Sequence, residues 1–186
     1  NEDYNDRFIM NSKAIAEGAS GKIYKGHYGS GEGSMRSVVV KENVSGTPRG
    51  DAMELLVQTF LFCDQRGNMD WIIEYGSKGA AKIPHPEFAA NMDNKKRFSG
   101  METLDETLED FLEFRPKESS DEHFERFRKL ALSVFSTLEY MQKSFEFVHG
   151  DLHVGNIMLK NGKPYIIDFG RSALNIWGRR QYADID

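Results

Sequence analysis

Residues 147–171 read FVHGDLHVGNIMLKNGKPYIIDFGR, and this stretch decides the fold of the chain. Within it, Asn161-Gly162 separates two apolar runs, and an Asn-Gly pair in that position predicts a tight β-hairpin. The hairpin would bring together three polar residues: Asp151 and Asn156 before its first strand, and Asp168 after its second. Two carboxylates and an amide in one place suit a hard divalent cation, and a further acid can accept a proton.

The same stretch resembles the catalytic core of the protein-kinase-like superfamily. Residues 149–156 are similar to its catalytic loop, and Asp168-Phe169-Gly170 is similar to its metal-binding Asp-Phe-Gly motif. Each motif is weak alone, but the two occur together, with Asp168 17 residues after Asp151. The resemblance implies that Asp151 accepts the proton of the acceptor hydroxyl. It also implies that Asn156 and Asp168 hold Mg²⁺, with Mn²⁺ as an alternative.

Size and composition indicate a globular protein. The chain has 186 residues, which is enough for one compact domain or two small lobes. It contains no apolar run of 18 residues, so we expect no membrane span, and its net charge of −5 argues against general nucleic-acid binding. A single cysteine, Cys63, is typical of a reducing compartment. We therefore expect a cytoplasmic protein, or one in the host cytosol if it is a viral or bacterial effector.

A glycine-containing run near the N-terminus fits the same family. Taken alone, Gly18 and Gly21 predict either a β-turn or a backbone that approaches phosphate groups. The run resembles the kinase Gly-rich loop, with alanine at position 16 in the first glycine place. The resemblance implies that Gly18 and Gly21 cover the phosphates, and that Ile15 and Ile23 cover one face of adenine.

The run Val38–Lys41 predicts a buried strand that ends in a lysine. A lysine there either reaches solvent or needs a charged partner. The family resemblance places Lys41 on the α- and β-phosphates of ATP and Val39 on the adenine. Its partner would be Glu54 in a helix predicted over residues 51–63. The alternative role for Glu54 is a capping box with Asp51, which would only stabilise the start of the helix.

The middle of the chain predicts a strand at residues 71–75, a long surface connection over residues 76–96, and a short strand at residues 98–101. The segment after that strand resembles the kinase hinge. The resemblance implies that Met101 is the gatekeeper and that Glu102 and Leu104 bind adenine through their backbone. It also assigns Met158 and Ile167 to the nucleotide site.

The clearest helix is predicted over residues 119–142, where Ser119 and Glu122 form a capping box. Its apolar residues recur at steps of three and four, so we expect them all in the core. They are Phe124, Phe127, Leu130, Ala131, Val134, Phe135, Leu138 and Met141.

These observations predict an α+β fold of the two-lobed protein-kinase-like type. A five-stranded antiparallel sheet with one helix would form the first lobe, residues 1–102, and a shortened, mainly helical lobe would occupy residues 103–186. Only 16 residues follow Gly170, and they lack the Ala-Pro-Glu motif and the later helices of that family. We therefore expect either a truncated or a minimal kinase, similar to short bacterial effector kinases.

The sequence is compatible with three functions. The first is an ATP-dependent Ser/Thr protein kinase that acts on a protein substrate or needs an activating partner protein. The second is a small-molecule kinase of the aminoglycoside or choline phosphotransferase type, which Gly150 and His153 in the catalytic loop resemble. The third is a pseudokinase that binds proteins without catalysis. Against the third, Lys41, Asp151, Asn156 and Asp168 are all present.

Overall fold

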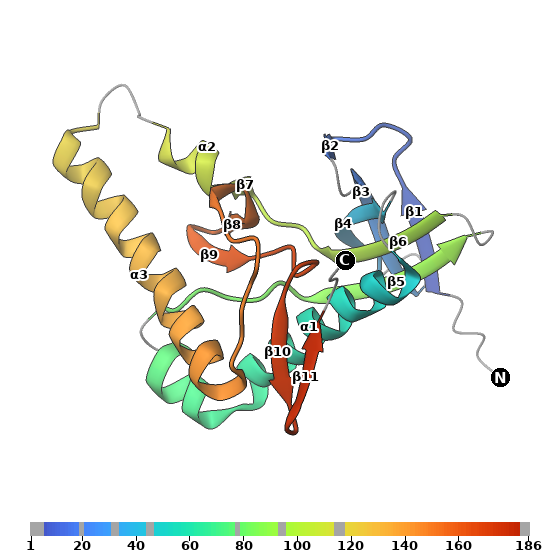
Figure 1. Cartoon of the computed structure of the whole chain (residues 1–186). Helices are drawn as coiled ribbons and strands as arrows, with labels where there is room; N and C mark the ends of the chain where they lie inside the picture. Colours follow the sequence, from blue (N-terminus) through green and yellow to red (C-terminus); the bar gives the residue numbers. More distant parts are fainter. Residues whose placement is uncertain are drawn as a thin grey trace.

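The computed structural model describes residues 6–18, 21–30, 34–43, 47–76, 79–92, 96–113 and 118–182. Figure 1 shows a large antiparallel sheet on the right, with helix α1 running from it toward the lower left, and helices α2 and α3 with the β7–β8–β9 sheet on the left. The β10–β11 hairpin lies between these parts, beside α1. This mixed α/β architecture, with antiparallel sheets and few helices, is compatible with a kinase-like fold. No helix in the described part of the chain is long and apolar enough to cross a membrane.

The large sheet has six strands, whereas the sequence predicted five. Its main path runs β1 (Asp6–Met10), β3 (Gly21–Ser30), β4 (Arg36–Asn43), β6 (Lys96–Glu102) and β5 (Pro86–Met92), and β2 (Ala16–Gly18) pairs with β3. The prediction of a surface connection over residues 76–96 is wrong, because β5 forms the edge of the sheet beside β6.

Alternation along β4 separates the two faces of this sheet. Val38 and Val40 are fully buried in a small core on one face, together with Tyr24 and Phe98. Lys41 therefore points to the opposite face, because successive side chains of a strand alternate.

Helix α1 (Pro48–Gly67) begins at Thr47, whose side chain accepts a hydrogen bond from the Gly50 N–H at 3.1 Å. Proline at the first helical position suits this start, because proline lacks the N–H that would have no partner there. The alternative of a capping box between Asp51 and Glu54 is therefore wrong. Asp51 instead pairs with Arg97 of β6.

The second half of α1 is fastened to the rest of the molecule. The Tyr140 hydroxyl donates to Asp64 at 2.5 Å, and Gln58 donates from its side chain to the Pro84 carbonyl at 3.1 Å. Phe60 packs edge-to-face on Phe145, with the ring centroids 4.9 Å apart. These contacts join α1 to α3 and to the segment that precedes β5.

Residues 71–75 form a π-helical turn, η1 (Trp71–Tyr75), so the predicted strand is wrong. The helical turn lets Trp71 stack on Tyr75 with 5.8 Å between ring centroids, and both rings pack on Tyr140. A strand would place these two rings about 13 Å apart along its axis, since each residue rises about 3.3 Å. The chain then runs through the core, where Ala81 and Ile83 are buried.

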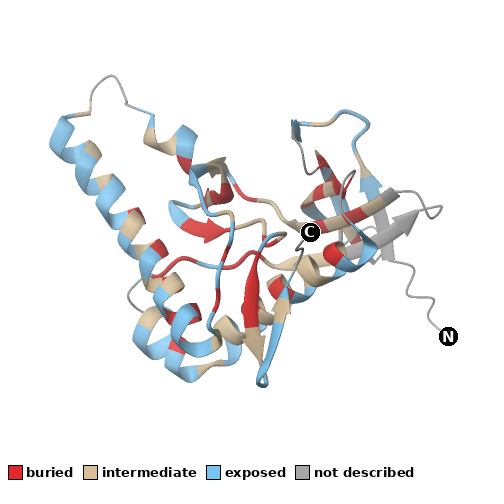
Figure 2. Cartoon of the chain, in the orientation of Figure 1, coloured by how far each residue is buried: buried red, intermediate tan, exposed pale blue. Residues whose placement is uncertain are grey.

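Helix α3 (Ser120–Phe145) has the predicted capping box between Ser119 and Glu122. Short helix α2 (Leu108–Leu112) precedes it. The prediction that all apolar residues of α3 are core is wrong in part. Leu130, Val134 and Met141 are buried, whereas Phe124, Phe127 and Phe135 are exposed. The apolar arc of α3 is wider than the surface that η1, β9 and β10 cover, and Figure 2 shows its outer side largely exposed.

The predicted hairpin is confirmed as β8 (Ile157–Lys160) and β9 (Lys163–Ile166), with β7 (Glu106–Thr107) beside β8. Its two turn residues, Asn161 and Gly162, have φ of 52° and 69°, as a type I′ turn requires. After Gly170 the chain forms a second hairpin, β10 (Ala173–Ile176) and β11 (Arg179–Tyr182). This half of the molecule therefore contains two small sheets and is less helical than predicted.

Candidate active site

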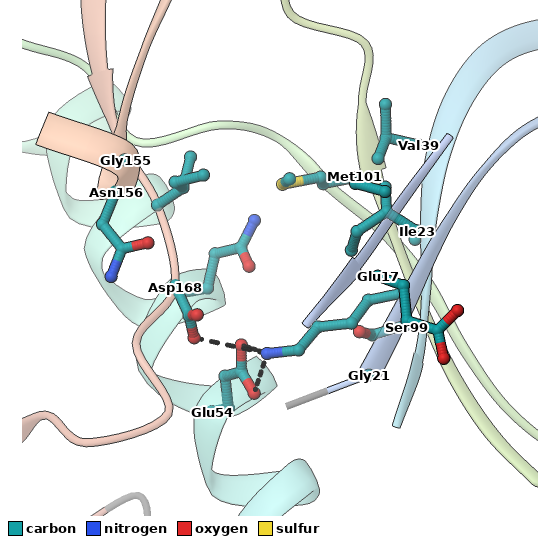
Figure 3. A pocket seen from close by; sticks show the side chains of 15 residues that line it. Glu17, Gly21, Ile23, Val39, Glu54, Ser99, Met101, Gly155, Asn156 and Asp168 are labelled. Atoms are coloured by element: carbon teal, nitrogen blue, oxygen red, sulfur yellow. Dashed lines mark hydrogen bonds and ion pairs between the residues drawn. The ribbon is translucent and has the colours of Figure 1, made fainter. Parts of the chain in front are cut away.

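A cavity of about 380 Å³, the front cavity, lies between the face of the large sheet that carries Lys41, helix α1, and the chain on either side of the β8–β9 hairpin. Figure 3 shows residues of the sheet, such as Val39 and Met101, on one side and Asn156 and Asp168 on the other. Nine of the residues predicted for the site line it: Gly21, Ile23, Val39, Lys41, Glu54, Met101, Asn156, Ile167 and Asp168.

The other predicted residues lie away from the lining of the front cavity. Ile15 is 53% exposed, and Leu104 is buried. Gly18 of β2 pairs with Gly21 of β3, and Met158 pairs with Tyr165 within the β8–β9 hairpin. Glu102 uses its backbone N–H to donate to the His85 carbonyl at 3.0 Å, so that N–H is not free for adenine.

Three polar residues of the cavity were missed by the sequence prediction, Glu17, Gln58 and Ser99, and the last two share a sequence signal. Gln58 follows Glu54 by four positions, which places both on one face of α1. Ser99 lies two positions before Met101 and pairs with Lys41 across the sheet, so it shares their face. Periodicity from Glu54 and Met101 could therefore have identified both.

A cluster of three charges forms the inner end of the front cavity. Lys41 Nζ lies 3.0 Å and 3.2 Å from the two carboxylate oxygens of Glu54, and 3.3 Å from Asp168 Oδ1 (Figure 3, dashed lines). The Lys41 and Glu54 side chains are only 17% and 16% exposed. Lys41 therefore does not reach out to solvent, and strand β4, helix α1 and the segment after β9 meet at its ammonium group.

The two carboxylates keep this ammonium charged. Burial alone lowers the pKa of Lys41, but the charges of Glu54 and Asp168 outweigh burial and raise that pKa. Burial also raises the pKa of Glu54, and the positive charge of Lys41 opposes that effect. The result is an ammonium group that keeps its charge at the front cavity.

Asp168 is held in an uncommon backbone conformation, with φ of 61°. Such conformations persist where the surrounding packing fixes them, and they concentrate at active sites. Here the next residue, Phe169, is fully buried and packs on the rings of Phe147 and His149. The buried Phe169 ring therefore anchors Asp168 at the edge of the cavity.

Asn156 and Asp168 both line the front cavity, and each has a side-chain oxygen, the ligand type that Mg²⁺ prefers. The Asn156 side-chain N–H donates to the Asp151 carbonyl at 2.9 Å, which leaves the amide oxygen of Asn156 as an available acceptor. No group of three or more His, Cys, Asp or Glu residues is arranged as a metal site in the described part of the chain. Mg²⁺ suits such a sparse protein site, because it is commonly held by one or two carboxylates together with phosphates and water.

Asp151 stands in the same loop, outside the lining of the front cavity. Its side chain is 40% exposed, and Arg171 Nη1 lies 3.7 Å from its Oδ1. The hydrogen bond from Asn156 to its backbone carbonyl fixes its position relative to the predicted metal ligands. The Asp151 carboxylate is therefore accessible to an acceptor group that approaches from solvent.

Gly150 has a left-handed backbone with φ of 77°, and a Cβ added there would lie 2.2 Å from the Arg171 carbonyl oxygen. Gly162 has a similar φ of 69° with open space around it. We expect Gly162→Ala to lower the free energy of unfolding by roughly 1–2 kcal/mol, the cost of a left-handed residue with a side chain. Gly150→Ala should cost clearly more, because the backbone has to shift. Urea denaturation of both variants measures the difference, and equal losses would contradict the steric explanation.

His149 is buried under the same loop, with its Nε2 3.0 Å from the Ile167 carbonyl oxygen. A carbonyl only accepts, so Nε2 carries the proton. The buried Nδ1 has no hydrogen-bond partner in the described part of the chain. Burial lowers the pKa of His149 below its usual 6.5, because a second proton would place an unpaired N–H in the core.

This lowered pKa predicts how stability depends on pH. The unfolded chain binds the extra proton more readily than the folded chain, so the contribution of His149 is complete above about pH 6.5 and is lost as pH falls through its lowered folded pKa. We expect His149→Gln to show a smaller loss of unfolding free energy between pH 7 and pH 5 than the wild type. Urea denaturation across that range measures it. Parallel curves for the two proteins would contradict the assignment.

The site combines a cavity between a sheet and a helical region, a lysine paired with two carboxylates, and the nearby Asn156 and Asp168, an arrangement compatible with a kinase-like phosphotransferase. Comparison with family models agrees, since the chain is similar to the phosphotransferase enzyme family over residues 86–177, just under half of its length. That match includes Asp151, Asn156 and Asp168. Comparison with curated proteins gives no significant match to the chain.

Proposed function

We propose that the protein is an ATP-dependent Ser/Thr protein kinase that transfers the γ-phosphoryl group of Mg-ATP to a protein hydroxyl. The observation that carries this proposal is the convergence of Lys41, Asn156 and Asp168 on one cavity, with Asp151 in the adjoining loop. In the proposed enzyme, residues 1–102 bind the nucleotide and residues 103–186 carry the catalytic loop.

The lining of the front cavity supports the proposal that this cavity binds a nucleotide. Ile23 and Val39 on the sheet and Ile167 opposite them form apolar walls, which suit a planar base. Phosphates that extend from the base toward Lys41 would meet its charged ammonium, and the amide oxygen of Asn156 and the Asp168 carboxylate would hold the metal. When bound, Mg²⁺ neutralises charge on the transferred phosphoryl group.

Within this proposal, Asp151 receives the proton of the acceptor hydroxyl as that oxygen attacks the γ-phosphorus. Lys41, held by Glu54, stabilises the negative charge on the phosphates. The flanking residues Leu152, His153 and Arg171 are exposed, so the approach to Asp151 is an open surface. An open approach supports a protein segment as the acceptor.

A small-molecule kinase remains a second candidate, favoured by the similarity to the phosphotransferase enzyme family. Gly150 also supports it, because its backbone conformation excludes the arginine that many protein kinases carry there. Both candidates share the front cavity and Asp151, and they differ in the acceptor alone.

Incubation with labelled ATP and Mg²⁺ tests the proposal. Wild-type protein and the Lys41→Ala variant would be compared alone, with a mixture of protein acceptors, and with a panel containing aminoglycosides and choline. We expect label on protein for the wild type and none for the variant. Label on a small molecule would establish the second candidate instead. Nucleotide binding with no transfer in any mixture would contradict both candidates and indicate a binding module.

A further inference from the structure

A second, larger cavity of about 740 Å³ is lined by residues from the end of β6, from α1 and from the segment before β5, and we call it the rear cavity. Strand β6 contributes to both cavities, since Ser99 and Met101 line the front one and Glu102 lines the rear one. The rear cavity is within the size range of small-molecule sites, which is about 300–1,000 Å³. Asp151 does not line it, so it is separate from the acceptor position.

The acidic groups of the rear cavity are already compensated. The Glu87 carboxylate, only 5% exposed, lies 2.9 Å from Arg36 Nη2 and 3.1 Å from His85 Nδ1. The contact with Arg36 is an ion pair without hydrogen-bond geometry. Glu102 accepts from Lys160 at 2.5 Å and from the His85 backbone N–H at 2.8 Å.

The last acid, Asp105, accepts a hydrogen bond from the Asn161 N–H at 2.7 Å, and its charge also acts on Lys160. Three acids of the rear cavity thus face four permanently charged cations. The cavity has a positive balance in a chain whose net charge is −5.

Two of the cations, Arg66 and Lys82, have no acidic partner among the residues that the structure describes. Arg66 lies over the Phe62 ring, 5.4 Å from its centroid, and this contact orients the guanidinium group. Lys82 is fixed at its backbone, where its N–H donates to the Pro164 carbonyl at 2.8 Å and its carbonyl accepts from the Ile166 N–H at 2.9 Å. The two side chains reach the rear cavity from α1 and from the segment that precedes β5.

We propose that the rear cavity binds a small multivalent anion, a phosphorylated or polycarboxylated metabolite, through Arg66 and Lys82. Guanidinium and ammonium groups are the side chains that bind phosphate and carboxylate oxygens most strongly. Phe62, Trp71 and Tyr165 supply aromatic surface for the carbon part of such a ligand. The proposal does not depend on the function proposed above.

The position of Trp71 allows a direct test. The chain has two tryptophans, and the other one, Trp177, is 94% exposed, so Trp177→Phe leaves Trp71 as the sole reporter in the rear cavity. In this background, Trp71 fluorescence would be titrated with pyrophosphate and, separately, with citrate, in the absence of nucleotide. We expect a saturable change with at least one of them. Pyrophosphate alone would identify a phosphate ligand, and citrate alone a carboxylate ligand.

Two double variants that remove the same charge test whether Arg66 and Lys82 bind the anion. Arg66→Ala with Lys82→Ala should weaken the binding of the probe about tenfold or more, since each removes a charge-assisted hydrogen bond. Lys129→Ala with Arg179→Ala removes the same charge from exposed positions outside the cavity and should leave binding within about twofold. The proposal is overturned if neither probe gives a saturable change. It is also overturned if the Arg66/Lys82 variant binds like the parent, or if both double variants lose affinity equally.

Discussion

Asp151→Asn is expected to lower kcat for phosphoryl transfer by about 10²- to 10⁴-fold, which is the usual contribution of a general base. Asparagine has the shape of aspartate but cannot take up the proton of the acceptor. The contact that fixes this residue is made by its backbone carbonyl, which accepts from Asn156, so the loop should keep its shape in the variant. Nucleotide affinity should therefore change little while turnover collapses.

The measurement is a steady-state rate with saturating ATP and the acceptor identified by the labelling experiment, together with a nucleotide-binding titration. Asp121→Asn is the matched control, because Asp121 is an exposed acid in the first turn of α3. Its rate should equal that of the wild type. If Asp151→Asn retained full transfer, Asp151 would not be the proton acceptor.

Lys41→Ala should reduce kcat by about 10²- to 10³-fold, the typical effect of removing one group that stabilises transition-state charge. The same change leaves Glu54 buried beside Asp168 without its cation. Breaking a buried pair from one side commonly costs about 3–5 kcal/mol of stability. We therefore expect Lys41→Ala to be both inactive and less stable in urea denaturation.

The double variant Lys41→Ala with Glu54→Gln separates these two effects. Neutralising Glu54 removes the uncompensated buried charge, so stability should recover while activity should not. Lys163→Ala, which removes an exposed lysine from β9, is the control for loss of a positive charge and should be unchanged in both measurements. Recovery of activity in the double variant would show that Lys41 acts only on stability.

Local chemistry explains why some features could be predicted from the sequence. The Asn161-Gly162 turn and the Ser119–Glu122 capping box depend on residues close in sequence, and both are present. Side chains alternate along β4, and α1 begins at Pro48, soon after that strand ends. The 13 residues from Lys41 to Glu54 are therefore enough to bring the two side chains into contact.

The features that were missed depend on distant partners. Residues 71–75 contain Ile and Tyr, which favour strands, but stacking of Trp71 and Tyr75 on Tyr140 of α3 stabilises a helical turn. Strand β5 begins at Pro86, directly after Pro84 and His85, so its start resembles a loop, and pairing with β6 makes it a strand. The apolar stripe of α3 shows which residues could be buried, whereas the elements that cover the helix decide which ones are.

The attachment of α1 has a kinetic consequence. Its second half is tied to α3 through Asp64 and Phe60, and Gln58, one turn after Glu54, is hydrogen-bonded to Pro84. These contacts hold α1 in the position where Glu54 pairs with Lys41. For the proposed kinase this means that substitutions which loosen the contacts of Asp64 and Phe60 should lower the rate of transfer, although neither residue lines the front cavity.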